Sequence, residues 1–145
     1  MISYEKYYTQ NLYPFQDGIL SIVKQSGAPF YLGGGTALSR AYYNKRYSDD
    51  IDLFINNSEK FDEYSQILFS ALEINQKPQN YKINFSSVKK FTGYMQLFCV
   101  RTGHNEEVSL KIDIINDKRL PAIYFLVQKT AFALKERRYK DVKFM

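Results

Sequence analysis

Cysteine and histidine are scarce in this chain of 145 residues, which contains one of each, Cys99 and His104. A single cysteine excludes an intramolecular disulfide and a zinc site built from cysteines. The sequence has no tryptophan, and no apolar run approaches the roughly 20 residues that a membrane-spanning helix needs. The N-terminus also lacks the basic and then apolar segments of a secretion signal. We therefore expect no membrane partner, and a reducing compartment, the cytoplasm, as the simplest location.

Internal repeats and low-complexity segments are equally absent. Hydrophobic residues make up 45% of the chain and charged residues 24%, which is ordinary for a globular protein. A chain of this length can bury roughly two-thirds of its unfolded surface. We therefore expect a single domain over residues 1–145.

What the sequence has in excess is aromatic side chains and positive charge. Tyrosine and phenylalanine account for 13 and 11 residues, and the net charge is +5. From Lys118 to Lys143 there are 8 basic and 2 acidic residues, against 12 basic and 13 acidic residues elsewhere. The basic excess therefore lies in the last segment. It indicates either a polyanionic partner, such as phosphate or nucleic acid, or a solvated helix face.

The order of the expected elements indicates a mixed sheet. Apolar spacing predicts a helix from Phe15 to Lys24 that ends near Gly27, and Ser58 is the expected N-cap of a helix that runs to Ile74. The remaining expected helices cover 36–43 and 121–138, and the expected strands cover 29–32, 49–55, 81–88, 93–101 and 107–115. This mixture predicts an α/β (α+β) fold, a mixed β-sheet flanked by helices.

The first chemical signal is the glycine run that follows the strand at 29–32. Gly33, Gly34 and Gly35 precede the expected helix at Thr36. Glycines let the backbone approach a ligand closely, and a helix N-terminus favours an anion. The junction therefore predicts either a phosphate-binding turn or a tight turn without a ligand.

The second signal is a pair of aspartates on one expected strand. Asp50 and Asp52 are two positions apart, so the period of a strand directs both carboxylates to the same side and Asp49 to the other. Carboxylates that close require a counter-charge, and Mg²⁺ or Mn²⁺ prefers such oxygen ligands. The alternative interpretation is an acidic edge strand or loop.

The third signal is Asp113, which lies among apolar residues in a later expected strand. A buried carboxylate is costly unless it is paired or binds a metal. A salt bridge to a neighbouring strand is the alternative. Taken together, a glycine turn, two aspartates on one strand and a third on another are the parts that metal-dependent phosphoryl transfer requires.

Three stretches of the sequence resemble those of a known family. Gly34 to Leu38 (GGTAL), Arg46 to Phe54 (RYSDDIDLF) and the stretch from Val127 to Asp141 resemble the AbiEii/AbiGii toxin family of nucleotidyltransferases, within the DNA-polymerase-beta-like superfamily. The resemblance spans roughly residues 28–141. It implies a nucleotidyltransferase fold in which the family's C-terminal helical region is largely absent.

The resemblance also implies roles for matching residues. Asp50, Asp52 and Asp113 would ligate Mg²⁺ or Mn²⁺, and Asp113 would also accept the proton of the incoming hydroxyl. The other implied site residues would bind the nucleotide: Gly34, Gly35, Thr36, Ser48, Lys129 and Asp141. Lys129 would also take part in catalysis by neutralising phosphate charge.

The implied activity is that of a toxin of a toxin–antitoxin or phage-defence pair. It would transfer a nucleoside monophosphate from an NTP to a hydroxyl acceptor, such as tRNA or another RNA, with a cognate antitoxin as a partner protein. Two alternatives stay open. The enzyme could modify a protein or small molecule, or a shortened domain could bind a nucleotide or a partner without turnover.

Overall fold

The computed structural model describes residues 6–33, 50–103 and 106–118, and the statements below concern these residues. The helical elements are the π-helix η1 (Tyr7–Leu12), the α-helices α2 (Tyr13–Ser26) and α4 (Phe61–Ile74), and the 3₁₀ helix η2 (Phe85–Ser87). The strands are β1 (Tyr31–Gly33), β2 (Asp50–Asn56), β3 (Lys82–Ile83), β4 (Lys89–Phe91), β5 (Tyr94–Gly103) and β6 (Glu106–Asp117). The expected mixture of helices and strands is confirmed.

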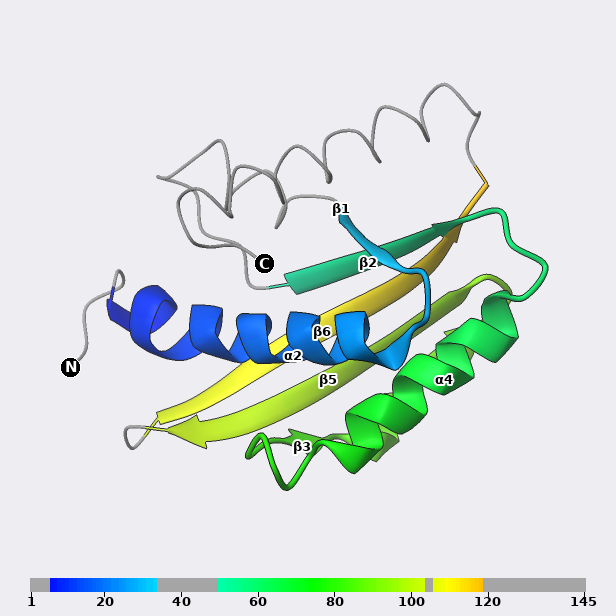
Figure 1. The fold of residues 1–145 in the computed structure, drawn as a ribbon. Helices are drawn as coiled ribbons and strands as arrows, with labels where there is room; N and C mark the ends of the chain where they lie inside the picture. The colour runs from blue at the N-terminus through cyan, green and yellow to red at the C-terminus, as the bar shows by residue number, and fades with distance from the viewer. Residues whose placement is uncertain (1–5, 34–49, 104–105, 119–145) are drawn as a thin grey trace.

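All six strands belong to one mixed sheet with the order β1-β2-β6-β5-β3, and β4 also pairs with β5. β2 runs parallel to β6, whereas the other pairs are antiparallel. The parallel pair is notable because β2 and β6 are distant in the sequence, and it brings them side by side at the centre of the sheet (Figure 1).

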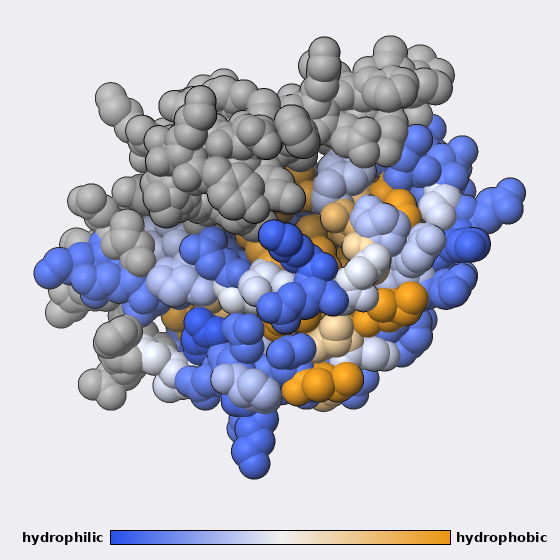
Figure 2. All heavy atoms as spheres, in the orientation of Figure 1, coloured by the Kyte–Doolittle hydropathy of each residue, from blue (hydrophilic) through white to orange (hydrophobic). Residues whose placement is uncertain are grey.

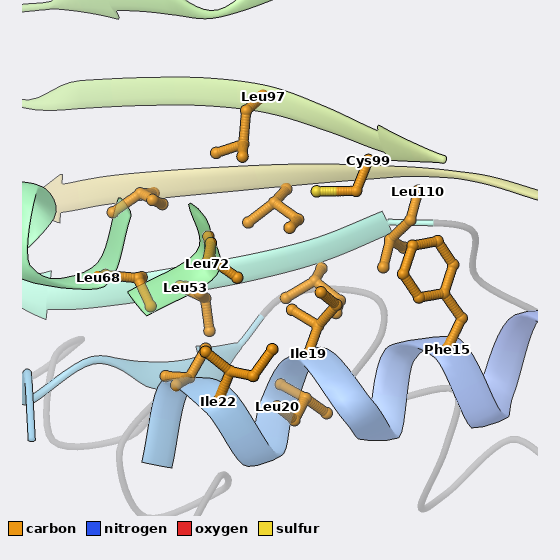
Figure 3. Packing of buried hydrophobic residues seen from close by; sticks show 14 of the residues in the cluster. Phe15, Ile19, Leu20, Ile22, Leu53, Leu68, Leu72, Leu97, Cys99 and Leu110 are labelled. Carbon is orange, nitrogen blue, oxygen red and sulfur yellow. The ribbon is translucent and has the colours of Figure 1, made fainter. Parts of the chain in front are cut away.

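The hydrophobic core lies between one face of this sheet and the helices α2 and α4 (Figure 1). Residues at alternate positions of β2 are buried, and Leu53 is 1% exposed. Figure 3 shows how α2 meets the strands: Phe15, Ile19 and Ile22 point from the helix toward Leu53, Cys99 and Leu110. Because the strand period is two, the residues between the buried ones lie on the opposite face, away from the helices.

Helix α2 ends where the sequence predicts. Gly27 follows it with φ +80°, a left-handed conformation that glycine adopts without steric cost. The tyrosines near the start of α2 pack against one another. Tyr8 is buried, and its ring makes edge contacts with those of Tyr7 and Tyr13. Cys99 is also a core residue, and burial raises the pKa of its thiol to about 12, which makes it unreactive.

Helix α4 begins later than expected. Its N-cap is Lys60, which makes no side-chain capping bond, so the prediction of Ser58 as the N-cap is wrong. The Ser58 hydroxyl instead accepts a hydrogen bond from the backbone N–H of Lys60 at 3.1 Å, as a turn residue does. The buried face includes Ser65, and Ile67 is 40% exposed, although apolar spacing alone would place Ile67 on that face.

The expected strand at 81–88 is broken. Only Lys82–Ile83 forms a strand, and the 3₁₀ helix η2 follows it, so Phe85 is 54% exposed. Residues 89–91 then form the short edge strand β4, and all three are exposed. The exposed lysines of such an edge discourage pairing with another sheet.

The outer surface of the two helices is largely polar. Figure 2, which views the molecule from the side of α2 and α4, shows hydrophilic side chains over most of their outer faces, with small hydrophobic areas between them. Among the residues that the structure describes, no helix has the length and apolar character to cross a membrane.

Candidate functional site

The candidate site lies on the face of the sheet that points away from α2 and α4. In β2 the residues Ile51, Leu53 and Ile55 are buried, and the intervening Asp50 and Asp52 lie on the opposite face. The prediction that Asp50 and Asp52 lie on one side of a strand is therefore confirmed. The cause is the apolar alternation of the strand, which commits one face to the core.

Asp113 joins the two aspartates from the neighbouring strand. In the parallel β2–β6 register Asp52 lies opposite Asp113, and Asp50 lies opposite Lys111. On the other side of Asp52 the partner is Gly33, the residue that precedes the predicted phosphate-binding glycines in the sequence. Three carboxylates from two separate sequence motifs thus share a small area at the centre of the sheet.

An ammonium group lies within this acidic cluster. The Nζ atom of Lys111 is 3.4 Å from Oδ2 of Asp50 and 3.5 Å from Oδ2 of Asp113. The two carboxylates, Asp113 first, raise the pKa of Lys111, so it carries its charge at neutral pH. The salt bridge that the sequence left open for Asp113 therefore exists, but its partner comes from the same strand.

Asp52 has the most perturbed carboxyl group of the cluster. Its pKa is raised from 3.8 to about 6, mainly because the group is partly buried and then because Asp113 and Asp50 repel its charge. A hydrogen bond with Asp113 raises it further, and Lys111 opposes the shift. The cluster therefore holds more negative charge than Lys111 neutralises, which is the condition under which a further cation binds favourably.

Two side chains of β5 fix the position of Asp113. Tyr94 donates a hydrogen bond from its hydroxyl to Oδ1 of Asp113 at 2.6 Å, and Nε2 of Gln96 donates to the same oxygen at 2.9 Å. Gln96 also donates to the Tyr94 hydroxyl at 2.8 Å. Burial, and next the bond to Asp113, raise the pKa of Tyr94, so the phenol keeps its proton. Oδ1 of Asp113 is thus committed to β5, while Oδ2 faces Lys111.

The donor chemistry of the cluster suits a hard divalent cation. Asp50, Asp52 and Asp113 offer only carboxylate oxygens, which Mg²⁺ and Mn²⁺ prefer. Across the described ranges 6–33, 50–103 and 106–118, no three or more such side chains already form a metal-ligand group.

The structure thus brings together three of the predicted site residues, Asp50, Asp52 and Asp113. The other predicted site residues lie outside the described residues: Gly34, Gly35, Thr36, Ser48, Lys129 and Asp141. The expected helices at 36–43 and 121–138, and His104, also lie outside them.

Three residues of the site were not predicted from the sequence. Lys111 lies two positions before Asp113, so the strand period alone would have placed it on the same face. Tyr94 and Gln96 alternate with the buried Met95 and Leu97, and the same rule would have placed them on that face. Their contact with Asp113 required the antiparallel register, in which Gln96 lies opposite Asp113.

The chain is similar to a known protein family. A family model described as "Nucleotidyl transferase AbiEii toxin, Type IV TA system" matches residues 19–132. The comparison with curated proteins found no match.

Two solved structures from Helicobacter pylori resemble the chain. The first, JHP933, has a TM-score of 0.52 and 20% identity over 84% of this chain and 49% of that chain, which shows a shared fold. The second, described provisionally as a nucleotidyltransferase, has a TM-score of 0.48 and 18% identity over 83% of this chain and 50% of that chain. The chain therefore spans about half the length of the solved structures it matches.

Proposed function

Because the chain belongs to the AbiEii toxin family of nucleotidyltransferases, we propose that it transfers a nucleoside monophosphate from an NTP to a hydroxyl group of an acceptor, in a reaction that depends on Mg²⁺ or Mn²⁺. The observation that carries the proposal is the register of β2 and β6, which sets Asp52 beside Asp113 and near Asp50. We favour the end of an RNA, such as tRNA, as the acceptor, and a cognate antitoxin as the partner protein.

The proposed roles follow from the contacts of each residue. Asp50, Asp52 and Asp113 would hold the metal, whose positive charge stabilises the phosphates and the departing pyrophosphate. Asp113 accepts the proton of the acceptor hydroxyl. The hydrogen bonds from Tyr94 and Gln96 keep Oδ1 of Asp113 in place, which leaves Oδ2 for the proton or the metal.

The chemical step balances without an oxidant or a further reactant. The acceptor oxygen forms a bond to the α-phosphorus of the NTP, and the bond from that phosphorus to the bridging oxygen breaks. The proton of the acceptor passes to Asp113, and pyrophosphate leaves. Lys111 lies 3.5 Å from Oδ2 of Asp113 and pairs with this carboxylate.

The residues implied by the family resemblance complete the proposal. Gly34, Gly35, Thr36 and Ser48 would bind the phosphates. Lys129 would neutralise phosphate charge, and Asp141 would complete the nucleotide site. Gly33, the last residue of β1, lies opposite Asp52. The predicted phosphate-binding glycines follow Gly33 directly in the sequence, which supports their assignment to the phosphates.

The experiment that tests the proposal follows the label of each α-³²P-labelled NTP in turn. The protein is incubated with the nucleotide, Mg²⁺ or Mn²⁺, and tRNA or total RNA. We expect label on RNA with the wild-type protein and a loss of about 10²–10⁴-fold in Asp50→Ala and Asp113→Asn. Glu73→Gln, an exposed substitution in α4, serves as the matched control and should retain activity.

The alternatives each give a different result in this assay. Label on a protein band would indicate a protein acceptor. Metal-dependent NTP binding by a wild-type protein that transfers no label to any acceptor would support a domain that binds without turnover, and the proposed reaction would be wrong.

A further inference from the structure

Beside the carboxylates, a row of aromatic and apolar side chains crosses the same face of the sheet. The strand register places Phe54 opposite Tyr31 and Ile115, and Ile115 opposite Tyr94. Tyr94 in turn lies opposite Phe91 on the edge strand β4. This aromatic row lies next to the polar row that contains Asp52, Asp113 and Gln96. Its members are two residues away along each strand, so the rows are about 7 Å apart.

Phe91, at the edge of the sheet, is the most open member of this row. Its side chain is 65% exposed, whereas the other members are partly buried. Its ring lies 6.2 Å from the ring of Tyr94, and the Tyr94 hydroxyl donates to Asp113. A continuous path of contacts therefore connects an exposed aromatic ring with the carboxylate proposed to accept the proton.

Positive charge accompanies Phe91. Lys89 and Lys90 precede it on β4 and are exposed, and Lys89 lies opposite Gln96 at the end of the polar row. Beyond Phe91 there is a hollow of about 600 Å³, with Lys118 on its wall. Lys90, Glu59 and Asp62 line the same hollow, and Lys90 lies opposite the buried Met95, so it belongs to the face of the sheet that the helices cover. Lys89 therefore supplies the positive charge on the carboxylate face.

The hairpin that carries Phe91 is held in place. Gly93 has φ +72°, which a side chain would disfavour, and the backbone N–H of Asn116 donates to its carbonyl at 2.9 Å. The Asn116 side chain bonds both the N–H and the carbonyl of Ser58. Edge protection explains the exposed lysines of β4. The ordered turn holds the exposed ring of Phe91 in a fixed place beside them.

We propose that the β4–β5 hairpin, Lys89–Tyr94, binds the single-stranded 3′ end of an RNA acceptor, with one base stacked on Phe91 and a phosphate near Lys89. Exposed aromatic side chains on a sheet, flanked by basic residues, bind single-stranded RNA in this manner. The inference rests on the proposed function in that it supplies the acceptor of the same site.

The distance along the sheet agrees with this arrangement. Phe91 lies two strands from Asp113 and in the adjacent row, which corresponds to about 12 Å. With the 3′ hydroxyl of the RNA at Asp113, a base a short way along the RNA chain can therefore reach Phe91. The hairpin would thus orient the RNA with its 3′ end toward the carboxylates.

The test measures binding in EDTA and without nucleotide, so that catalysis is not required. The probe is a fluorescein-labelled single-stranded RNA of about eight nucleotides with a free 3′ hydroxyl, followed by fluorescence anisotropy. We expect Phe91→Ala to raise Kd by about tenfold, and Phe91→Trp to bind as well as the wild type. Phe85→Ala is the matched control, because Phe85 is also exposed and lies on the side of α4, in contact with Phe69.

Lys89 is tested by the salt dependence of Kd. Lys89→Gln should reduce the slope of log K against log salt by about 0.7, because one phosphate contact is lost. Lys24→Gln removes the same charge from an exposed position elsewhere and should leave most of the slope unchanged. Melting temperatures of all variants confirm that each protein is folded.

Equal binding by Phe91→Ala and Phe85→Ala would overturn the inference, as would equal slopes for Lys89→Gln and Lys24→Gln. If Phe91→Ala retained RNA binding and instead abolished a dimer seen by sedimentation, the hairpin would be a protein contact and the inference would be wrong. RNA binding that depends on Phe91 in a protein that transfers no label would leave this surface standing and overturn the proposed reaction. Label transfer to RNA that is unchanged by substitution of Phe91 and Lys89 would support the proposed reaction and overturn this surface.

Discussion

Asp52 and Asp113 lie opposite one another on two parallel strands, and the charge of Asp113 disturbs the carboxyl group of Asp52. The proximity of Asp113 is, after burial, the largest cause of the raised pKa of Asp52. Like charges held at this spacing destabilise the protein unless a cation or a proton intervenes. This relationship makes the site measurable through stability as well as through activity.

Asp52→Asn should stabilise the protein at neutral pH in EDTA. The pKa of Asp52 is about 6 in the folded protein and 3.8 in the reference state, so the folded protein holds this proton more tightly. The unfolded state ionises first as the pH rises, and stability therefore falls between about pH 4 and about pH 6. The asparagine, which cannot ionise, should raise the melting temperature at about pH 7.5 and much less at about pH 4. An equal effect at both pH values would contradict this account.

Tyr94→Phe should impair the reaction by releasing Oδ1 of Asp113. The substitution removes the hydroxyl that donates to this oxygen at 2.6 Å and retains the ring. Residues that orient a metal ligand typically contribute about 10–100-fold in activity or metal affinity. We expect kcat to fall by about tenfold and the Mg²⁺ requirement to rise, with KM for the NTP unchanged. Tyr64→Phe, on α4, is the control, and an unchanged kcat in Tyr94→Phe would exclude the positioning role.

Lys111→Met should tighten the binding of Mn²⁺. The ammonium pairs with Asp50 and Asp113, so its removal takes away a cation that competes with a divalent ion for these carboxylates. Stability in EDTA should fall by less than about 1 kcal/mol, because the pair is partly exposed. The metal concentration at half of the maximal thermal shift reports the affinity, with Lys82→Met as the control. Weaker binding in Lys111→Met than in the control would show that Lys111 supports the metal site and does not compete with it.

Gly27→Ala tests how much the backbone conformation at the end of α2 contributes to stability. A Cβ at this position would meet no atom within 4 Å, so steric contact is not involved, but the φ of +80° is unfavourable for alanine. We expect a loss of about 1 kcal/mol, measured from the midpoint of urea unfolding. At Gly103 a Cβ also meets no atom, and φ lies outside the left-handed region, so Gly103→Ala should cost less. Equal losses in both variants would contradict the conformational explanation.

Much of the sheet could be predicted from the sequence because the strands alternate strictly. β2 and β6 lie close to their expected positions, and Asp50 and Asp52 point to one side as the period requires. The segment at 81–88 was mispredicted because Tyr81, Ile83 and Phe85 have the spacing of a strand. A strand also requires a partner along its whole length, and β5 pairs only with residues 82–83 of this segment.

The contacts within the site were harder to predict. Apolar spacing shows which face Asp113 occupies, but its neighbours Tyr94 and Gln96 depend on the register of β5, which follows from the geometry of the turn and the packing of the whole sheet. The ion pairs of Lys111 depend on side-chain conformation, which a sequence pattern does not specify.

The parallel register of β2 and β6 has a consequence for how this site persists over time. A slip of β2 by one residue against β6 would turn Asp52 into the core and bring Ile51 to the surface, so the pairing that aligns the carboxylates is also the pairing that folds the protein. Selection for stability alone would therefore preserve the alignment of the two strands. In lineages that lose activity, the side chains should change before their alignment does, and an inactive descendant would still present its substituted residues side by side.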